Sequence, residues 1–374
     1  MKLLSKLKKK NIVGKTFLVR IDLNADFEKG KEMFRLEAVI PTFSFLIRNG
    51  AKKIVIVSHR GRPKHHTHDA SLDIFAPAIA KRTEEAVDFI SAYRVGALVK
   101  AVKKSDVKIV LLENIRFFSG EETNDPSFAK ALAACADVYV NDAFAVNHRA
   151  NASVVAITDY LPSYGGLLLE KEIKNLSAIL QKPKHPFVIL VGGAKIFDKI
   201  NILKNLSKPA DMFLLGGGAA NTLFAAEGIP IGNSLVDTSV FRKITPYLSS
   251  EKVMLPLDTV MFRGAILDIG QETIARYEKI IASARTIVWS GPFGLFQKEA
   301  FSHGTEKMWR AIFKNKKAHI VVGGGETITS LRLLRSTHPV PKNIFLSTGG
   351  GAMLEYLSGK KLPGIVALEK NKKQ

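Results

Sequence analysis

The sequence predicts an α/β protein with two doubly wound, parallel, Rossmann-like sheets. Near-continuous apolar runs recur along the 374-residue chain, each followed by a polar or glycine-rich loop and a helix-like stretch. Such runs are typical of strands buried on both faces of a parallel sheet, and helical segments such as 127–135 and 273–283 alternate with them. The expected strands are residues 17–21, 54–57, 109–112 and 138–140 in the first half and 187–191, 212–215, 287–289, 319–322 and 343–346 in the second.

The length and composition favour a globular protein of two domains. Apolar residues make up 46% and charged residues 24%, which excludes a disordered chain and a small disulfide-held domain. A single cysteine, Cys135, excludes an internal disulfide and a cysteine-based zinc site, and it fits a cytoplasmic location. No apolar run approaches about 18 residues, so the chain is not expected to enter a membrane. The start, MKLLSKLKKK, lacks a long apolar stretch, so we do not expect export.

The loops after the strands differ between the two halves, which predicts two domains with different ligands. First-half loops are rich in Arg, His, Asp and Asn, and second-half loops are rich in Gly. Ligands of open parallel sheets bind beyond the carboxyl ends of the strands, where these loops lie. We expect a first domain at 1–169, a connecting helix at 170–183 and a second domain at 184–355. A helix of about 12 residues spans about 18 Å, enough to hold two domains on either side of a cleft.

The net charge of +21 predicts an anionic partner. Nucleic acid, an anionic membrane and small phosphorylated metabolites all fit such an excess. The lysine clusters at 8–10, 314–317 and 370–373 lack interleaved aromatic residues, so nucleic acid is the less expected partner.

Cationic side chains of the first half predict an anion site. They are Arg20, His59, Arg62, Arg116 and Arg149 at or just after strand ends, with Arg35 in a segment that can reach the same edge. The planar guanidinium fork donates paired hydrogen bonds to phosphate or carboxylate. Asp22 and Asn24 point to one side of their strand and suit a ligand hydroxyl. The alternative interpretation is a set of surface arginines that happen to follow strands.

Glycine loops of the second half predict a nucleotide-phosphate site. They read GGAK at 192–195, GGG at 216–218, GGGE at 323–326 and TGGG at 348–351. Backbone N–H groups in such loops can approach a phosphate, and Lys195 and Lys199 lie on one helix face. Neither a P-loop nor GxGxxG after a strand is present, and close helix–sheet packing is the alternative explanation.

No nucleophile-centred site is predicted. The sequence has no GxSxG or HExxH motif, and Cys135 lies in an alanine-rich helix as a small core residue. The histidines at 65, 66 and 68 are interpreted as residues of a polar loop rather than metal ligands. A transfer reaction that needs only positioning and charge neutralisation fits these residues.

Ordered motifs along nearly the whole chain carry a resemblance to a known family. They are VRIDLN at 19–24, SHRGRP at 58–63, LENIRF at 112–117, NDAF at 141–144, HRA at 148–150, GGAKIFDKI at 192–200, LGGG at 215–218 and STGGG at 347–351. The chain resembles phosphoglycerate kinase. The resemblance implies reversible phosphoryl transfer between 1,3-bisphosphoglycerate and ADP, giving 3-phosphoglycerate and ATP with Mg²⁺. The carboxylate acceptor of the reverse reaction is ionised at neutral pH, so no general base is required.

The resemblance also implies roles for individual residues. The phosphoglycerate would be bound by Asp22, Leu23, Asn24, Arg35, His59, Arg60, Gly61, Arg62, Arg116 and Arg149. The migrating phosphoryl group would be stabilised by Arg35, Lys195, Gly350 and Gly351. The nucleotide would be held by Lys195, Lys199, Gly216, Gly217, Gln297, Gly324, Gly325, Glu326 and Thr327, with Glu326 next to Mg²⁺. The family further implies a monomer whose domains close about a hinge, with a tail at 356–374 that returns to the first domain.

The chain departs from the family pattern mainly in the nucleotide half. Ser290, Gln297 and Glu326 stand where the family usually has Asn, Glu and Asp. The longer Glu326 could displace the metal by about an ångström, a shift that can cost roughly 100-fold in rate. The alternatives to an active kinase are therefore the same fold with shifted or weakened nucleotide use, or a basic nucleic-acid-binding protein.

Overall fold

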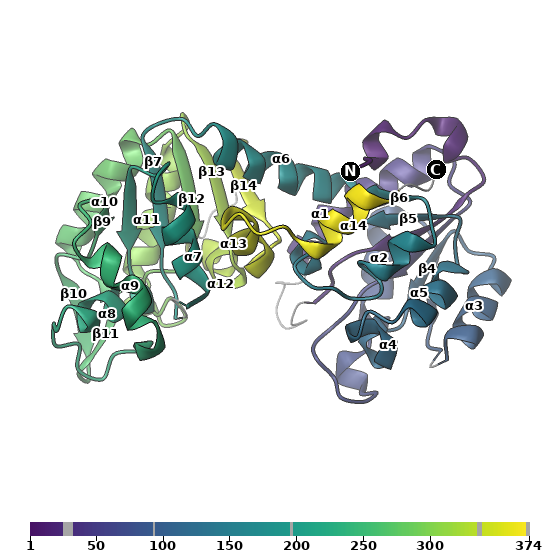
Figure 1. Cartoon of the computed structure of the whole chain (residues 1–374), viewed down its shortest axis with the longest axis horizontal. Coiled ribbons are helices and arrows are strands. Elements are labelled where there is room, and N and C mark those ends of the chain that lie inside the picture. Colours follow the sequence, from purple (N-terminus) through teal and green to yellow (C-terminus); the bar gives the residue numbers. More distant parts are fainter. Residues whose placement is uncertain (25–32, 93, 195–196, 335–338, 372–374) are drawn as a thin grey trace. The chain divides into compact units, whose positions relative to one another are not determined.

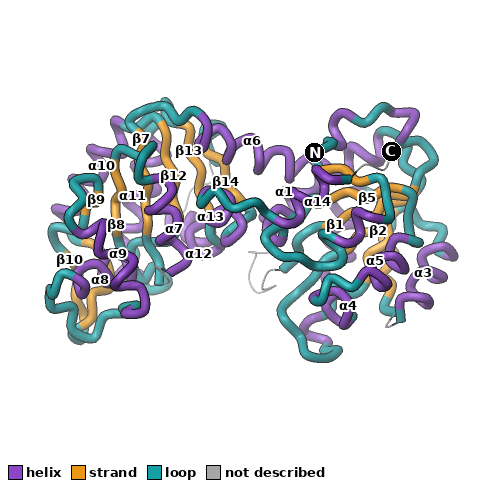
Figure 2. Tube along the Cα trace, in the orientation of Figure 1, coloured by secondary structure: helices purple, strands orange, loops and turns teal. Residues whose placement is uncertain are grey.

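The computed structural model describes residues 1–24, 33–92, 94–194, 197–334 and 339–371. The chain forms two compact units: Met1–Ile173 together with Lys361–Gln374, and Lys174–Lys360. Each unit contains one six-stranded parallel sheet with helices around it (Figures 1 and 2). The structure thus confirms the predicted fold class.

The sheet of the first unit has the strand order β3-β4-β2-β1-β5-β6. Its strands are β1 (Thr16–Arg20), β2 (Lys53–Val57), β3 (Val87–Ile90), β4 (Ile109–Leu112), β5 (Val138–Asn141) and β6 (Ser163–Gly165). All neighbouring strands are parallel. The edge strands β3 and β6 were not predicted, because neither is a continuous apolar run: β3 is half-buried and β6 has only three residues.

Helices and a buried apolar core support this sheet. The helices are α1 (Met33–Arg48), α2 (Ala76–Thr83), α3 (Val95–Lys104), α4 (Ser119–Glu122), α5 (Pro126–Ala133) and, from the end of the chain, α14 (Pro363–Lys370). The core joins side chains of β1 and β2 to those of α1, among them Phe17, Ile54 and Phe43. Cys135 follows α5 and is buried, and burial raises the pKa of its thiol to about 12.

The sheet of the second unit has the order β14-β13-β12-β7-β8-β9. Its strands are β7 (Phe187–Val191), β8 (Met212–Leu215), β9 (Val253–Met254), β12 (Thr286–Ser290), β13 (His319–Gly323) and β14 (Ile344–Ser347). Every strand predicted from sequence in either unit is present to within one residue at each end. A separate antiparallel hairpin, β10 (Thr259–Phe262) with β11 (Ala265–Ile269), was not predicted.

The helices of this part of the chain alternate with the strands. They are α6 (Leu167–Gln181), α7 (Phe197–Leu206), α8 (Gly217–Ala226), α9 (Phe241–Leu248), α10 (Gln271–Ser283), α11 (His303–Lys314), α12 (Gly325–Thr329) and α13 (Gly351–Leu357). α6 covers most of the segment assigned to the connection, and the division between the units falls within it. Among the helices that the structure describes, none is long and apolar enough to cross a membrane.

Candidate active site

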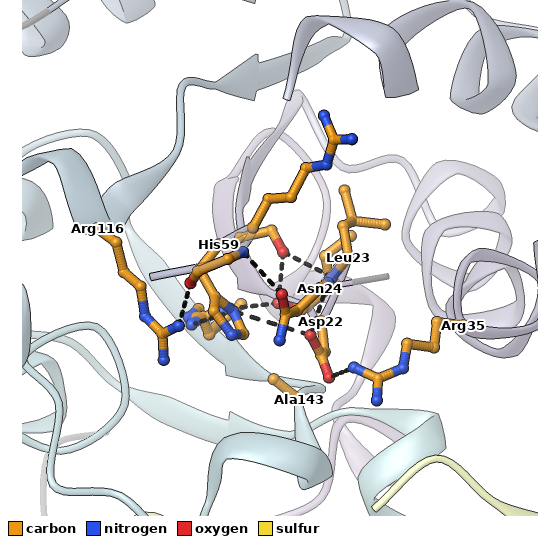
Figure 3. A network of polar contacts seen from close by, with 12 residues as sticks. Asp22, Leu23, Asn24, Arg35, His59, Arg116 and Ala143 are labelled. Atoms are coloured by element: carbon orange, nitrogen blue, oxygen red, sulfur yellow. Dashed lines mark hydrogen bonds and ion pairs between the residues drawn. The ribbon is translucent and has the colours of Figure 1, made fainter. Parts of the chain in front are cut away.

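The loop that follows β1 is held in place by the loop that follows β2. The backbone N–H of Leu23 donates to Ser58 Oγ at 2.8 Å, and that hydroxyl donates to the carbonyl of Ile21 at 3.0 Å. The side-chain oxygen of Asn24 accepts from the N–H of Gly61 at 2.8 Å. Both loops therefore lie at the carboxyl edge of the sheet as one hydrogen-bonded layer (Figure 3).

Asp22 is a buried acid at the centre of this layer. Its carboxylate forms an ion pair with Arg35, which extends from α1, and lies 3.8 Å from His59 Nδ1. Figure 3 shows Asp22 and His59 between Arg35 on one side and Arg116 on the other. The structure thus brings Arg35 to the same edge as the strand-end residues, as the sequence predicts.

His59 is neutral, and its tautomer follows from its neighbours. Its pKa lies well below 6.5, first because the ring is buried and then because guanidinium groups surround it. In order of effect these groups belong to Arg20, Arg116, Arg35 and Arg149. Arg20 Nη2 lies 3.3 Å from His59 Nδ1, and a guanidinium can only donate. Nδ1 is therefore the acceptor, and Nε2 carries the proton.

Arg116 and Arg60 are held by backbone contacts of the same loops. Arg116 donates to the carbonyl of Gly61, and its Nε lies 3.4 Å from Glu122. Burial, followed by the charge of Arg149, lowers the pKa of Arg116 to about 10. The guanidinium of Arg60 donates to the carbonyl of Ser71 at 3.3 Å.

The remaining two arginines are less constrained. Arg149 is half-buried and donates from Nε to His148 Nε2 at 3.2 Å. Arg62 is exposed, and no hydrogen bond or ion pair holds its side chain within the described part of the chain. Both side chains can therefore adjust to a bound ligand.

Sequence reasoning missed the residues that hold these cations. Asn114 is fully buried and donates to the carbonyls of Arg60 at 2.7 Å and Ala70 at 2.8 Å, while accepting from the N–H of Arg116 at 3.1 Å. Ser58 fixes the loop after β1 in a similar way, through its hydrogen bonds to Leu23 and Ile21. The available signal was their position just beyond a strand: Ser58 directly follows β2, and Asn114 is the second residue after β4.

In the second unit, many of the glycines are explained by close packing. A Cβ on Gly192 would lie 2.3 Å from the carbonyl oxygen of Pro292, and one on Gly291 would lie 2.1 Å from that of Gly192. A Cβ on Gly216 would lie 2.5 Å from the ring of Phe293, and Gly217 has a φ of +56°. These loops interlock, so the packing explanation holds for this group.

Other glycines have open space beside them. A Cβ on Gly325, Gly350 or Gly351 would meet no atom within 4 Å. Gly324 and Gly350 have positive φ values of +98° and +44°, which glycine adopts readily. The backbone at these two loops, which precede α12 and α13, is therefore accessible to a ligand.

The polar side chains around these loops are placed as follows. Lys199 is buried, and its Nζ lies 3.3 Å from the position that a Cβ on Gly193 would take. Thr327 is buried and accepts from the N–H of Gly291 at 2.8 Å. Gln297 and Glu326 are exposed. Lys195 lies outside the described residues.

No group of three or more His, Cys, Asp or Glu side chains is arranged to hold a metal within the described ranges. Glu326, an exposed carboxylate at the start of α12, offers an oxygen ligand close in sequence to the open glycine Gly325. Mg²⁺ is commonly held by one or two carboxylates together with substrate phosphates. A single carboxylate therefore fits a metal that arrives with a nucleotide.

Comparison with known proteins identifies the family. The family model described as phosphoglycerate kinase matches residues 7–360. The chain belongs to the phosphoglycerate kinase family. It is 37% identical to the phosphoglycerate kinase of Dictyoglomus turgidum, over 97% of this chain and 98% of that one. It is 40% identical to that of Desulforudis audaxviator, over 96% and 97% of the two chains.

Solved phosphoglycerate kinase structures have the same fold. The Pyrococcus horikoshii enzyme superposes with a TM-score of 0.87 at 29% identity, covering 99% of this chain and 98% of that one. The Coxiella burnetii enzyme gives 0.80 at 34% identity, covering 99% of each chain. These matches confirm the resemblance and the phosphotransferase activity. The chain therefore has the activity of this family, the reversible transfer of a phosphoryl group between 1,3-bisphosphoglycerate and ADP in glycolysis.

Proposed function

We propose that the first unit binds 3-phosphoglycerate through its basic loops and that the second binds Mg-ATP through its open glycine loops. The observation that carries the proposal is the grouping of Arg20, Arg35 and Arg116 around Asp22 and the neutral ring of His59 at the carboxyl edge of the first sheet. A ligand with a phosphate and a carboxylate supplies the anionic groups that such a set can bind.

Individual residues have distinct roles in this proposal. Arg116 and Arg149 bind the phosphate, while Asp22 accepts from the substrate hydroxyl and the side-chain amide of Asn24 donates to the hydroxyl oxygen. The Nε2–H of His59 donates to the carboxylate, which the positive surroundings keep ionised. Arg35 is released from Asp22 when substrate arrives and stabilises the charge of the migrating phosphoryl group.

The nucleotide side of the proposal assigns the phosphates to backbone N–H groups of the open glycines and to two lysines. Lys199 and Lys195 neutralise the phosphates, and Gly350 and Gly351 approach the transferred group. Glu326 would hold Mg²⁺, whose charge offsets that of the phosphate oxygens. Gln297 donates to the ribose, and Ser290 together with Gln297 and Glu326 sets the nucleotide preference.

A coupled assay of 3-phosphoglycerate phosphorylation, with Mg-ATP and Mg-GTP in parallel, tests this assignment. We expect turnover to require both substrates and Mg²⁺, and the ATP/GTP ratio to report on the nucleotide site. Binding of 3-phosphoglycerate without turnover on either nucleotide would contradict the proposed role of the second unit.

Lys195→Ala tests the charge-neutralising role directly. We expect kcat to fall by at least about 100-fold while 3-phosphoglycerate affinity stays within about twofold. Lys204→Ala, which replaces an exposed lysine of α7, is the matched control and should keep full activity. An equal loss of turnover and phosphoglycerate affinity would assign Lys195 to substrate binding or to structure instead.

A further inference from the structure

We propose that Glu121 is a positioning residue that sets the geometry of the basic site. Glu121 lies in α4 and is completely buried, although it carries a carboxyl group. A buried carboxyl group is stable only when its oxygens accept hydrogen bonds or pair with a charge. The partners of Glu121 all lie in or next to the segments that carry the cationic side chains. The inference rests on the proposed function of the first unit.

Side-chain and backbone atoms of Glu121 hold the segment that follows Arg149. Its carboxylate accepts from the hydroxyl of Ser153 at 2.7 Å and from the backbone N–H of Ser153 at 2.9 Å. Its carbonyl accepts from the N–H of Ala152 at 2.9 Å and from Asn151 Nδ2 at 3.3 Å. Residues 151–153 are thus fixed at several points, only two positions beyond Arg149.

The same carboxylate reaches His59 through Arg20. Arg20 is buried, its Nε donates to Ser153 Oγ at 2.9 Å, and its Nη2 lies 4.0 Å from Glu121. Ser153 accepts from Arg20 and donates to Glu121, so the direction of its hydroxyl is fixed. Arg20 Nη2 in turn lies 3.3 Å from His59 Nδ1. Glu121 therefore orients the guanidinium that selects the tautomer of His59.

Arg116 lies close to Glu121 in the sequence, in the same short segment. It lies in the short 3-10 helix Ile115–Phe117 that leads into α4, and Glu122, the next residue after Glu121, pairs with its Nε. One short segment consequently supports the positions of Arg20, Arg116 and Arg149. Burial raises the pKa of Glu121, while Arg20 and the hydrogen bonds from Ser153 act in the opposite direction. Replacing this carboxyl group leaves Arg20 buried without its acidic partner, which is unfavourable enough to displace it.

Glu121→Gln tests the inference by calorimetric titration with 3-phosphoglycerate in the absence of nucleotide. We expect the dissociation constant to rise about tenfold, since hydrogen bonds to a charged group are lost. The affinity for Mg-ATP should stay within about twofold. Asp142→Asn, which removes another fully buried carboxylate of this unit, is the matched control and should leave phosphoglycerate affinity unchanged.

A second readout distinguishes positioning from a merely structural role. Nitrogen-15 NMR of the imidazole should show Nε2–H for His59 in the wild type and a mixture of tautomers in Glu121→Gln. Ser153→Ala removes only the bridging hydroxyl, and this variant is used in place of Glu121→Gln if Glu121→Gln does not fold. We expect it to raise the phosphoglycerate dissociation constant about threefold.

Two results would overturn the inference, and they are distinguishable. Wild-type affinity for 3-phosphoglycerate in Glu121→Gln, or in Ser153→Ala if Glu121→Gln does not fold, would show that Glu121 stabilises the fold alone. Failure of the wild-type protein itself to bind 3-phosphoglycerate would instead refute the proposed function, and this inference with it.

Discussion

At the scale of single residues, the first unit contains buried carboxyl groups whose charge is set by burial against the effect of their hydrogen-bond partners. Asp142 is fully buried after β5, where it accepts from the hydroxyl of Thr42 at 2.6 Å and from the N–H of Leu169 at 3.0 Å. It thereby caps the first turn of α6. Burial raises the pKa of Asp142 to about 7 despite these hydrogen bonds. The group therefore titrates near neutral pH.

This titration predicts a pH-dependent stability. Between pH 3.8 and about 7 the folded chain binds the Asp142 proton and the unfolded chain does not, so stability falls as pH rises through this window. Relative to Asp142→Asn, we expect the wild type to lose about 3 kcal/mol of unfolding free energy between pH 5 and 8. Urea denaturation across this range measures the difference. Parallel pH profiles for the two proteins would contradict the prediction.

The site residues could be predicted as types but not as a network. The sequence shows arginine, histidine and aspartate residues at or just after the ends of the predicted strands. Because parallel strands end at one edge of the sheet, these residues could be predicted to lie close together. The supporting roles of Ser58, Ser153 and Glu121 were not visible, since serine and glutamate side chains are usually exposed. Only their burial and partners distinguish them.

At the scale of elements, the glycine loops of the second unit divide into two kinds. Gly192, Gly216 and Gly291 stand where another chain segment lies too close for a side chain. Gly325, Gly350 and Gly351 stand beside open space. Both kinds of glycine occur in the same sequence pattern. Only the surrounding structure distinguishes glycines required by close packing from glycines whose backbone a ligand can reach.

A pair of alanine substitutions tests this division. Gly192→Ala should destabilise the protein by roughly 2 kcal/mol or more, because the added Cβ meets rigid backbone. Gly325→Ala should leave the melting temperature nearly unchanged, while the KM for Mg-ATP rises about tenfold because the added methyl group hinders a phosphate. Thermal melts and steady-state kinetics measure both. A destabilised Gly325→Ala protein with normal KM would refute the distinction.

At the scale of the whole molecule, the first unit includes the last residues of the chain as well as the first. Residues of the tail pack into it, with Leu362, Ile365 and Leu368 buried. The N–H of Gly364 donates to the carbonyl of Asn147 at 3.0 Å. Asn371 donates to the carbonyl of Leu161 at 3.2 Å. The tail is therefore part of the core of a unit that begins at Met1.

Truncation after Lys360 should destabilise the first unit selectively, by about 4 kcal/mol or more from the lost apolar burial. Both tryptophans, Trp289 and Trp309, belong to the second unit, so their fluorescence reports on that unit alone. We expect the circular dichroism transition to split, with an earlier phase that tryptophan fluorescence does not detect. Truncation after Asn371 keeps the contacts above and serves as the control. A single, unshifted transition after removal of 361–374 would contradict this.

The sequence by itself determined the strands of the two sheets and the residue types at their carboxyl edges. Buried parallel strands are continuous apolar runs, and the residues that follow them must face a common edge. The tertiary structure decided what depends on contacts between distant segments. These are the short and half-buried strands β3, β6 and β9, the hairpin of β10 and β11, and the path from Glu121 through Ser153 to Arg20. Arg20 and Ser153 are 133 residues apart, and no local pattern encodes that they touch.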